Sequence, residues 1–350
     1  MQQDGKYKMK VGINGFGRIG RAILRKVLES KDFEIVVIND INPDNKNIAY
    51  QLKYDSLYGT LKNEIKTNDK GITIDGKQIF IFHEKYIENV KWEWYNAEIV
   101  IDSSGVYRNI EGARELKGKV KHIVLTNSPK EVKTIIMGVN ENEIKDDFII
   151  SNSICDANAI APIVNLLNKA YGIEHGFVTT LHPYLQYQNL LDGSSPSFAY
   201  PNSIYPHYGL GRASTFSLIP KPTTAVEAVC KVLKELEGKF YAFSYRVPTA
   251  VVSSSDISIK LSRKVTVDEI KNLFETEAKK QKYKIFYNNY EPLVSIDFKG
   301  MEYSVVIDQR WTKIKGNYLK LVLWYDNEWG YSCRVVDLVN CLFKRHIKED

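Results

Sequence analysis

The amino-acid sequence predicts two domains, an α/β domain with a parallel sheet followed by an α+β domain with a mostly antiparallel sheet. The chain has 350 residues, which is more than a typical single core holds. In its first part, short apolar runs alternate with helical patterns, as in βαβ units. From about Cys155 onward, long strands with alternating polarity take over. We expect the first domain to span residues 1–154 with a C-terminal helix at 330–350, and the second to span 155–329.

Apolar periodicity predicts the elements of the first domain in chain order. KVGINGF (10–16) and EIVVIND (34–40) have the character of strands, and RAILRKVLES (21–30) between them has apolar residues at helical spacing. Three later segments are also predicted to be strands: EIVIDSSG (98–105), KHIVLTNS (121–128) and IIMGVN (135–140). The final helix is predicted in SCRVVDLVNCLFKRHIK (332–348), which has one apolar face and a basic end.

The second domain opens with a predicted helix, NAIAPIVNLLNKAYG (158–172). Strands are predicted in six later segments: GFVTTL (176–181), YAFSYRV (241–247), SSSDISIKL (253–261), PLVSIDF (292–298), YSVVIDQRW (303–311) and YLKLVLWY (318–325). Two further helices are predicted at 223–238 and 266–281. Residues 189–217 are rich in Ser, Pro, Gly and Tyr and form the longest predicted loop, and a loop of that length is usually functional.

Composition narrows the class of protein. The formal net charge of +6 is spread without a dense basic block, which suits an anionic small molecule as well as nucleic acid. The four cysteines form neither a disulfide framework nor a metal-binding spacing, so we expect reduced thiols. There is no signal-peptide core and no run of about 18 apolar residues. We therefore expect a soluble cytoplasmic protein that does not bind a membrane.

A glycine motif follows the first strand and opens the first helix. It reads Gly15-Phe16-Gly17-Arg18-Ile19-Gly20, and a second strand ends in Asp40, twenty residues later. This context is typical of a Rossmann dinucleotide-binding domain, whose helix N-terminus binds the pyrophosphate. A carboxylate at position 40 can accept hydrogen bonds from the ribose hydroxyls, and it repels a 2′-phosphate. Asp40 therefore favours NAD over NADP. We predict that residues 15–19 and Asp40 bind the cofactor. The alternative is a glycine-rich turn that binds no ligand. The side chains of Arg18 and Arg21 either contact phosphate or are solvated.

Cys155 lies in SNSICDANAIAP (151–162), at the predicted start of a helix. A helix N-terminus lowers a thiol pKa, although free cysteines are more often buried filler. His182, in TTLH, is the nearest candidate base, with a structural strand-end histidine as the alternative.

Several motifs occur together in order, and they give the chain a strong family resemblance. These motifs are GINGFGRIGR, KYDSLYG (53–59), the SN-x-x-C-x-x-N pattern of 151–158, TTLH (179–182), YRVPTA (245–250) and WYDNEWGYS (324–332). Together they resemble glyceraldehyde-3-phosphate dehydrogenase over nearly the whole chain.

This resemblance implies an NAD-dependent aldehyde dehydrogenase with Cys155 as nucleophile and His182 as base, and a homotetramer. The Cys155 thiohemiacetal would become a thioester, which inorganic phosphate would release as an acyl phosphate. It also implies that Asn327 holds the nicotinamide carboxamide and that Tyr331 lies beside that ring. Three further residues would line the cofactor: Ser104, Gly105 and Thr126. Arg246 and Thr223 match anion-binding positions, and Arg212 is a candidate for the loop arginine of the family.

The chain departs from the family pattern where that family binds phosphate. The residues beside the cysteine are Ile154 and Asp156 in place of Ser and Thr, and Leu185 replaces a threonine. An ionised Asp156 would repel phosphate by roughly 4 kcal/mol at 4 Å and an effective dielectric near 20. Asp156 either caps the helix or acts on the substrate or on a water molecule.

Three hypotheses follow. The first is oxidation of glyceraldehyde 3-phosphate or a related small aldehyde by NAD, with phosphorolysis open. The second is a relative that acts on a different sugar-derived aldehyde and hydrolyses the thioester to an acid. The third is a catalytically weak NAD-binding regulatory or RNA-binding protein, against which the retained Cys155 and His182 argue. The aromatic residues of the 189–217 loop (Phe198, Tyr200, Tyr205 and Tyr208) serve either subunit packing or a ligand.

Overall fold

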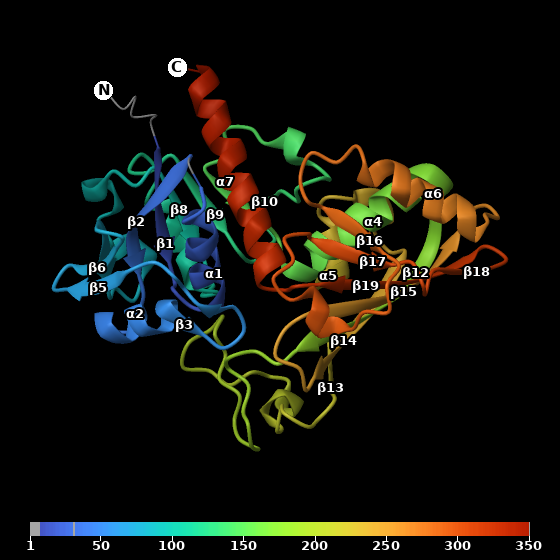
Figure 1. Cartoon of the computed structure of the whole chain (residues 1–350), viewed down its shortest axis with the longest axis horizontal. Helices are drawn as coiled ribbons and strands as arrows, with labels where there is room; N and C mark the ends of the chain where they lie inside the picture. The colour runs from blue at the N-terminus through green and yellow to red at the C-terminus, as the bar shows by residue number, and fades with distance from the viewer. Residues whose placement is uncertain (1–7, 31, 350) are drawn as a thin grey trace. The chain divides into compact units, whose positions relative to one another are not determined.

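The computed structural model describes residues 8–30 and 32–349 and divides the chain into two compact units (Figure 1). Unit 1 consists of the described residues up to Lys133, of Ile144–Asn152 and of those from Val335 onward. Unit 2 consists of Thr134–Glu143 and Ser153–Arg334. A functional domain boundary between residues 154 and 155 stays a prediction.

Unit 1 has a nine-stranded sheet in the order β10-β11-β9-β8-β1-β2-β7-β6-β5. The pairings from β11 to β7 are parallel, and the β7-β6-β5 end is antiparallel. Every residue of β8 and β9 is buried, as expected for parallel strands covered on both faces. The parallel α/β class is therefore confirmed. The main elements are β1 (Met9–Asn14), α1 (Arg18–Val27), β2 (Phe33–Asn39), α2 (Asn45–Lys53), β5 (Ile65–Asn68), β6 (Gly71–Ile74), β7 (Lys77–Phe82), β8 (Ile99–Asp102), α3 (Arg108–Arg114), β9 (His122–Leu125), β10 (Lys133–Thr134) and β11 (Ile149–Ser151).

A chain of polar side chains joins the carboxyl ends of three neighbouring strands in unit 1. Asn39 Nδ2 donates to Asn14 Oδ1 over 2.8 Å, and Asn14 Nδ2 donates to Asp102 Oδ1 over 2.9 Å. All three side chains are buried, so these bonds satisfy groups that would otherwise be costly. These hydrogen bonds hold the carboxyl end of β1 in place, and the glycine turn begins there.

Unit 2 has an eight-stranded sheet whose main path runs β13-β14-β12-β15-β19-β17-β16, with β18 paired to β19. Two of these pairings are parallel, β12 with β14 and β16 with β17, and the others are antiparallel. The mostly antiparallel α+β class is therefore confirmed. Its main elements are α4 (Cys155–Tyr171), β12 (Ile173–Pro183), β13 (Ile219–Lys221), α5 (Ala225–Cys230), β14 (Phe240–Val247), β15 (Ser253–Leu261), α6 (Val267–Ala278), β16 (Phe286–Asn289), β17 (Val305–Asp308), β18 (Lys313–Lys315), β19 (Tyr318–Tyr325) and the start of α7 (Trp329–Glu349).

Two predicted strands are wrong, and both segments are apolar for another reason. Residues 135–140 form a buried turn, in which Asn140 Oδ1 accepts the Ile136 N–H over 2.8 Å. Within 292–298 the structure has a 3-10 helix, Ser295–Phe298, whose Phe298 ring stacks on Trp324. Ile135, Ile136 and Met137 of the first segment, and Phe298 alone of the second, are buried without a strand partner. The helix expected over 223–238 is also shorter, because the regular part ends at Cys230.

The sheet of unit 2 has one covered face and one exposed face along β12. Val178, Thr180 and His182 are buried, whereas Phe177 and Leu181 are exposed. Alternation places these two sets on opposite faces, and helix α4 contacts β12, β15 and β17. His182 therefore points to the covered face. Among the described residues, no helix is long and apolar enough to cross a membrane.

Candidate active site

The glycine turn of unit 1 has the form that a pyrophosphate requires. Gly15 has a φ of +85°, and a Cβ on Gly20 would lie 2.4 Å from Gly15 O. A side chain is therefore excluded at both positions. Gly17 is the N-cap of α1 and has no side-chain capping bond, and the space where its Cβ would lie is open. A helix leaves its first N–H groups without acceptors inside the helix, and the open space beside Gly17 has room for the phosphate oxygens that such groups bind.

Asp40 follows β2 and braces this turn. Its Oδ2 accepts the Phe16 N–H over 2.6 Å, and its Oδ1 accepts the Asn42 N–H over 2.9 Å. The Arg18 guanidinium pairs with Asp55 and is partly buried.

The other predicted cofactor residues of unit 1 are distributed over two strand ends. Ser104 Oγ donates to Asp102 Oδ1 over 2.7 Å, and the next residue, Gly105, has a φ of +70°. Thr126 Oγ1 donates to Asp102 O over 3.1 Å. Because β8 and β9 are parallel neighbours, these turns leave the same edge as the glycine turn. The side chains of unit 1 therefore fit a dinucleotide.

In unit 2, the turn before Cys155 is strained and braced. Ser153 has a φ of +60°, which non-glycine residues seldom adopt. Its carbonyl accepts the Tyr331 hydroxyl over 2.9 Å, and both side chains are buried. The hydroxyl of Tyr331 thus holds the chain that delivers Cys155 to the first position of α4.

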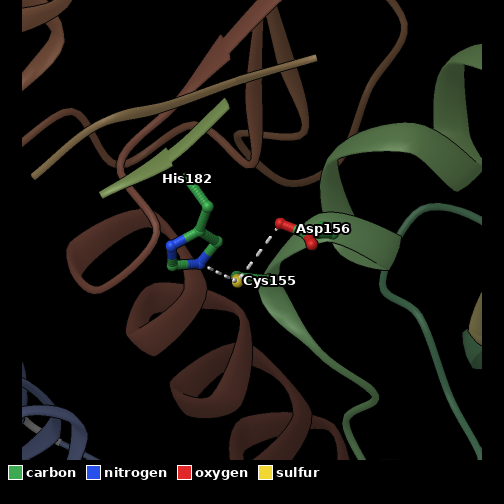
Figure 2. A group of neighbouring side chains, drawn as sticks. All are labelled: Cys155, Asp156 and His182. Atoms are coloured by element: carbon green, nitrogen blue, oxygen red, sulfur yellow. Dashed lines mark hydrogen bonds between the residues drawn. The ribbon is translucent and has the colours of Figure 1, made fainter. Parts of the chain in front are cut away.

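Cys155, Asp156 and His182 lie together, as Figure 2 shows. The Sγ atom of Cys155 is 3.7 Å from His182 Nε2 and 3.6 Å from Asp156 Oδ1. His182 Nδ1 lies 2.9 Å from Pro183 O. A carbonyl oxygen can only accept, so Nδ1 carries the proton and Nε2 presents its lone pair to the thiol. The predicted pairing of Cys155 with His182 is present in the structure.

Asp156 does not cap the helix. The N-cap of α4 is Ile154, which makes no side-chain capping bond. Instead, Asp156 Oδ1 accepts the Tyr325 hydroxyl over 2.7 Å. Asp156 is 6 % exposed, so this carboxylate is held inside the site, beside the thiol.

Burial and charge together favour neutral groups at the catalytic pair. Burial raises the pKa of the Cys155 thiol well above its ordinary value, and the Asp156 carboxylate adds to this rise while Arg246 opposes it. Burial lowers the pKa of His182 to about 3, with Arg246 acting in the same direction. Without substrate, the site therefore holds a thiol and a neutral imidazole.

Two cations face the same site from neighbouring strands. Arg246 on β14 pairs in register with His182 on β12 and with Ile219 on β13. Arg246 is 7 % exposed, and its Nε has no hydrogen-bond partner among the described residues. Lys221 lies two residues beyond Ile219, on the face that carries Arg246. A buried guanidinium N–H without a partner indicates an anion site.

Sequence reasoning missed Lys221 and Tyr325. Burial lowers the pKa of Lys221 to about 8, and the nearby Arg246 contributes while Asp156 opposes. Nothing in the sequence pointed to Lys221, because only the register between β13 and β14 brings this residue to the face that carries Arg246. Tyr325 lies within the WYDNEWGYS motif, but no spacing connects it with Asp156.

The remaining predicted residues of unit 2 differ in their placement. Thr223 follows β13, and its Oγ1 accepts the Ala225 N–H over 3.3 Å. Asn327 is buried, and its Oδ1 has no partner among the described residues, so it is available to an amide. Arg212 is exposed and pairs with Asp192 over 2.8 Å. In the long loop, burial and the nearby Tyr187 raise the pKa of Tyr205, while Arg246 opposes this rise.

The chain was compared with known proteins. The family model described as "Glyceraldehyde 3-phosphate dehydrogenase, NAD binding domain" matches residues 9–110, and the model of the C-terminal domain matches residues 154–327. The cytosolic glyceraldehyde-3-phosphate dehydrogenase 3 of Zea mays is 40% identical over 337 residues, which cover 95% of this chain and 97% of the relative. Glyceraldehyde-3-phosphate dehydrogenase 2 of Saccharomyces cerevisiae is 38% identical over 339 residues, covering 96% and 99%. Glyceraldehyde-3-phosphate dehydrogenase 1 of Bacillus cereus is 38% identical over 336 residues, covering 94% and 97%.

Proposed function

The chain belongs to the glyceraldehyde-3-phosphate dehydrogenase family, and we propose that it oxidises glyceraldehyde 3-phosphate or a closely related phosphorylated aldehyde with NAD. The observation that carries the proposal is the position of Cys155 Sγ, 3.7 Å from the free lone pair of His182 Nε2. A nucleophile and a base held in this way suit covalent catalysis at a carbonyl carbon.

The thiol and the imidazole act together. Because the free site holds a neutral thiol, Sγ adds to the aldehyde carbon as its proton passes to Nε2. The resulting imidazolium then faces the oxygen of the thiohemiacetal and stabilises its charge. The oxidised acyl group remains on Sγ as a thioester.

When bound, NAD would supply the hydride acceptor for this oxidation. The residues proposed to hold it in unit 1 are the glycine turn, Asp40, Ser104, Gly105 and Thr126. Those proposed in unit 2 are Asn327 and Tyr331, which the family resemblance assigns to the nicotinamide.

Arg246, Lys221 and Thr223 form the proposed site for the phosphate of the substrate. The unpartnered Nε of Arg246 supports this assignment, because a buried guanidinium is costly without an acceptor. Lys221 adds a second positive charge on the same face. The proposed role of Arg212 at the substrate rests on sequence alone.

The position of Asp156 favours water as the group that releases the acyl chain. A carboxylate 3.6 Å from Sγ repels a second phosphate, whereas it accepts a hydrogen bond from water and orients its oxygen. Hydrolysis would yield a carboxylic acid in place of an acyl phosphate.

A second copy of the chain is the proposed partner. Phe177 and Tyr241 stack on the exposed face of the unit 2 sheet, next to Phe243, and all three are exposed. Such a patch is typical of a subunit interface, which supports the proposed homotetramer. The four free cysteines support a cytoplasmic location for the protein, because thiols stay reduced in the cytoplasm. Light scattering of the purified protein gives the oligomeric state, and Phe177→Lys is expected to shift it toward smaller species.

One assay tests the proposed reaction. Purified protein is mixed with NAD and glyceraldehyde 3-phosphate, with and without inorganic phosphate, and NADH absorbance is followed. We expect NADH in both mixtures and 3-phosphoglycerate as product. Absence of NADH with this and a panel of phosphorylated aldehydes would overturn the dehydrogenase proposal. A rate that depends wholly on phosphate would overturn hydrolysis alone.

A further inference from the structure

The catalytic pair and Asp156 present three different metal-binding atoms to one point. The Sγ of Cys155, a carboxylate oxygen of Asp156 and Nε2 of His182 all lie within 4.8 Å of one another (Figure 2). A thiolate, an imidazole and a carboxylate are the three ligand types that Zn²⁺ takes from proteins. Asp156 is the member that the family resemblance does not supply, since a threonine is expected there.

Two of the three separations between the ligand atoms fit a tetrahedral ion. With zinc–ligand bonds of about 2.3 Å to sulfur and about 2.1 Å to nitrogen or oxygen, tetrahedral angles place the sulfur about 3.6 Å from either partner. The measured distances from Sγ are 3.7 Å to Nε2 and 3.6 Å to Oδ1. The two pairs that share the sulfur are therefore already at the spacing of a bound ion.

Two of the ligands already have the hydrogen-bond partners that metal ligands usually have. Metal-binding histidines donate their second ring N–H to an acceptor, and His182 Nδ1 faces Pro183 O at 2.9 Å. Ligating carboxylates are themselves hydrogen-bonded, and Asp156 accepts the Tyr325 hydroxyl at 2.7 Å. These bonds orient the two ligands before any ion arrives.

The charges limit which ion the site takes. A thiolate and a carboxylate balance two positive charges, while Arg246 and Lys221 on the neighbouring strands oppose a cation. Hard ions that need many oxygen ligands gain little here, because only one of the three ligands is an oxygen. A soft or borderline ion bonds strongly enough to the sulfur to overcome this repulsion.

We propose that Cys155, Asp156 and His182 form an inhibitory Zn²⁺ site whose fourth position is open to water. The inhibitory part rests on the proposed function, because the ion would occupy the sulfur and the imidazole lone pair that the oxidation uses. The binding part does not depend on it.

The test measures binding separately from catalysis. Metal-free protein is titrated with Co²⁺ under anaerobic conditions, and Zn²⁺ affinity is measured by competition with a chromophoric chelator. We expect one ion per chain, a thiolate-to-cobalt charge-transfer band, and protection of Cys155 from iodoacetamide that a chelator reverses. No such band, or no protection, would overturn the site.

Matched variants identify the third ligand. Asp156→Thr, and the near-isosteric Asp156→Asn, keep Cys155 and His182 and are expected to weaken Zn²⁺ binding at least tenfold. Cys230→Ser, far along the chain from the site, is the control and should bind as the parent does. Equal affinity in parent and Asp156 variants would overturn the assignment of Asp156. NAD binding and thermal unfolding show whether each variant is folded.

Activity measurements separate the two proposals. If the metal-free enzyme is active, one equivalent of Zn²⁺ is expected to abolish NADH formation. Addition of a chelator is then expected to restore it. Unchanged activity with Zn²⁺ bound would overturn inhibition. A protein that binds Zn²⁺ but oxidises no aldehyde would instead overturn the proposed function and leave the metal site standing.

Discussion

Tyr325 donates its hydroxyl hydrogen to Asp156 Oδ1 over 2.7 Å, joining the end of β19 to the first turn of α4. Both residues are buried. Burial and the Asp156 charge raise the pKa of Tyr325 well above its ordinary value, so the phenol remains a donor throughout the range in which the protein is handled. This bond fixes the carboxylate beside Cys155, with Oδ1 3.6 Å from Sγ.

Tyr325→Phe is expected to destabilise the fold. The substitution removes the donor and leaves a buried carboxylate oxygen short of a partner, which costs about 1–3 kcal/mol. Urea unfolding monitored by fluorescence measures this free energy. The double variant with Asp156→Asn is expected to lose less than the sum of the two single losses, because the partners share one interaction. Strictly additive losses would contradict a direct bond.

Asp156→Thr is expected to make the reaction depend on phosphate. The change removes the charge that repels an incoming phosphate and restores a hydroxyl that can donate to it. We expect phosphate to raise the steady-state rate of the variant at least tenfold and the rate of the parent by less than twofold. Trapping the product with hydroxylamine distinguishes acyl phosphate from acid. A variant that remains indifferent to phosphate would show that Asp156 does not select the acceptor.

Much of this fold could be predicted because local patterns carry it. The alternation of β12, the glycine turn and the start of α4 each follow from residues close together in sequence. The run at 135–140 was misassigned because burial alone does not distinguish a turn from a strand. Lys221 and Tyr325 were missed because strand register and helix–sheet packing bring them to the site, and neither is visible in local spacing.

The affinity for a phosphorylated aldehyde is expected to fall as pH rises through about 8. Burial and Arg246 lower the pKa of Lys221 to about 8, so this side chain is cationic below that pH and neutral above it. The charged groups near it are Arg246 and Asp156, and His182, which is also close, is neutral in this pH range. Its attraction for the phosphate is therefore present below pH 8 and lost above. Loss of one charge-assisted bond corresponds to about a tenfold rise in KM.

Steady-state kinetics between pH 7 and pH 9.5 measure this change in KM. Lys221→Met is expected to have the raised KM at every pH. Lys221→Arg keeps its charge and should remove the alkaline rise. A parent enzyme whose KM stays flat across this range, or a Lys221→Met variant that keeps the rise, would remove Lys221 from the site.

Arg246→Leu is expected to separate stability from substrate binding. The guanidinium is buried with an unpartnered Nε, so its removal in the absence of anion should stabilise the fold or leave it unchanged. The KM for a phosphorylated aldehyde should rise at least a hundredfold, and that for an unphosphorylated one far less. Inorganic phosphate should raise the Tm of the parent and not that of the variant. Equal protection of both proteins by phosphate would place the anion elsewhere.

Asp40→Asn is expected to relax the choice between NAD and NADP. The carboxylate of Asp40 already accepts the N–H groups of Phe16 and Asn42, which fixes its position beside the glycine turn. A 2′-phosphate brought to this position meets a negative charge, and at 4 Å that repulsion is about 4 kcal/mol at an effective dielectric near 20. Asparagine keeps an acceptor and removes the charge, so the ratio of kcat/KM for NAD to that for NADP should fall at least tenfold. Asp69→Asn, in the exposed turn between β5 and β6, changes the net charge equally and serves as the control. The same fall in both variants would mean that overall charge, and not the carboxylate at the end of β2, selects the cofactor.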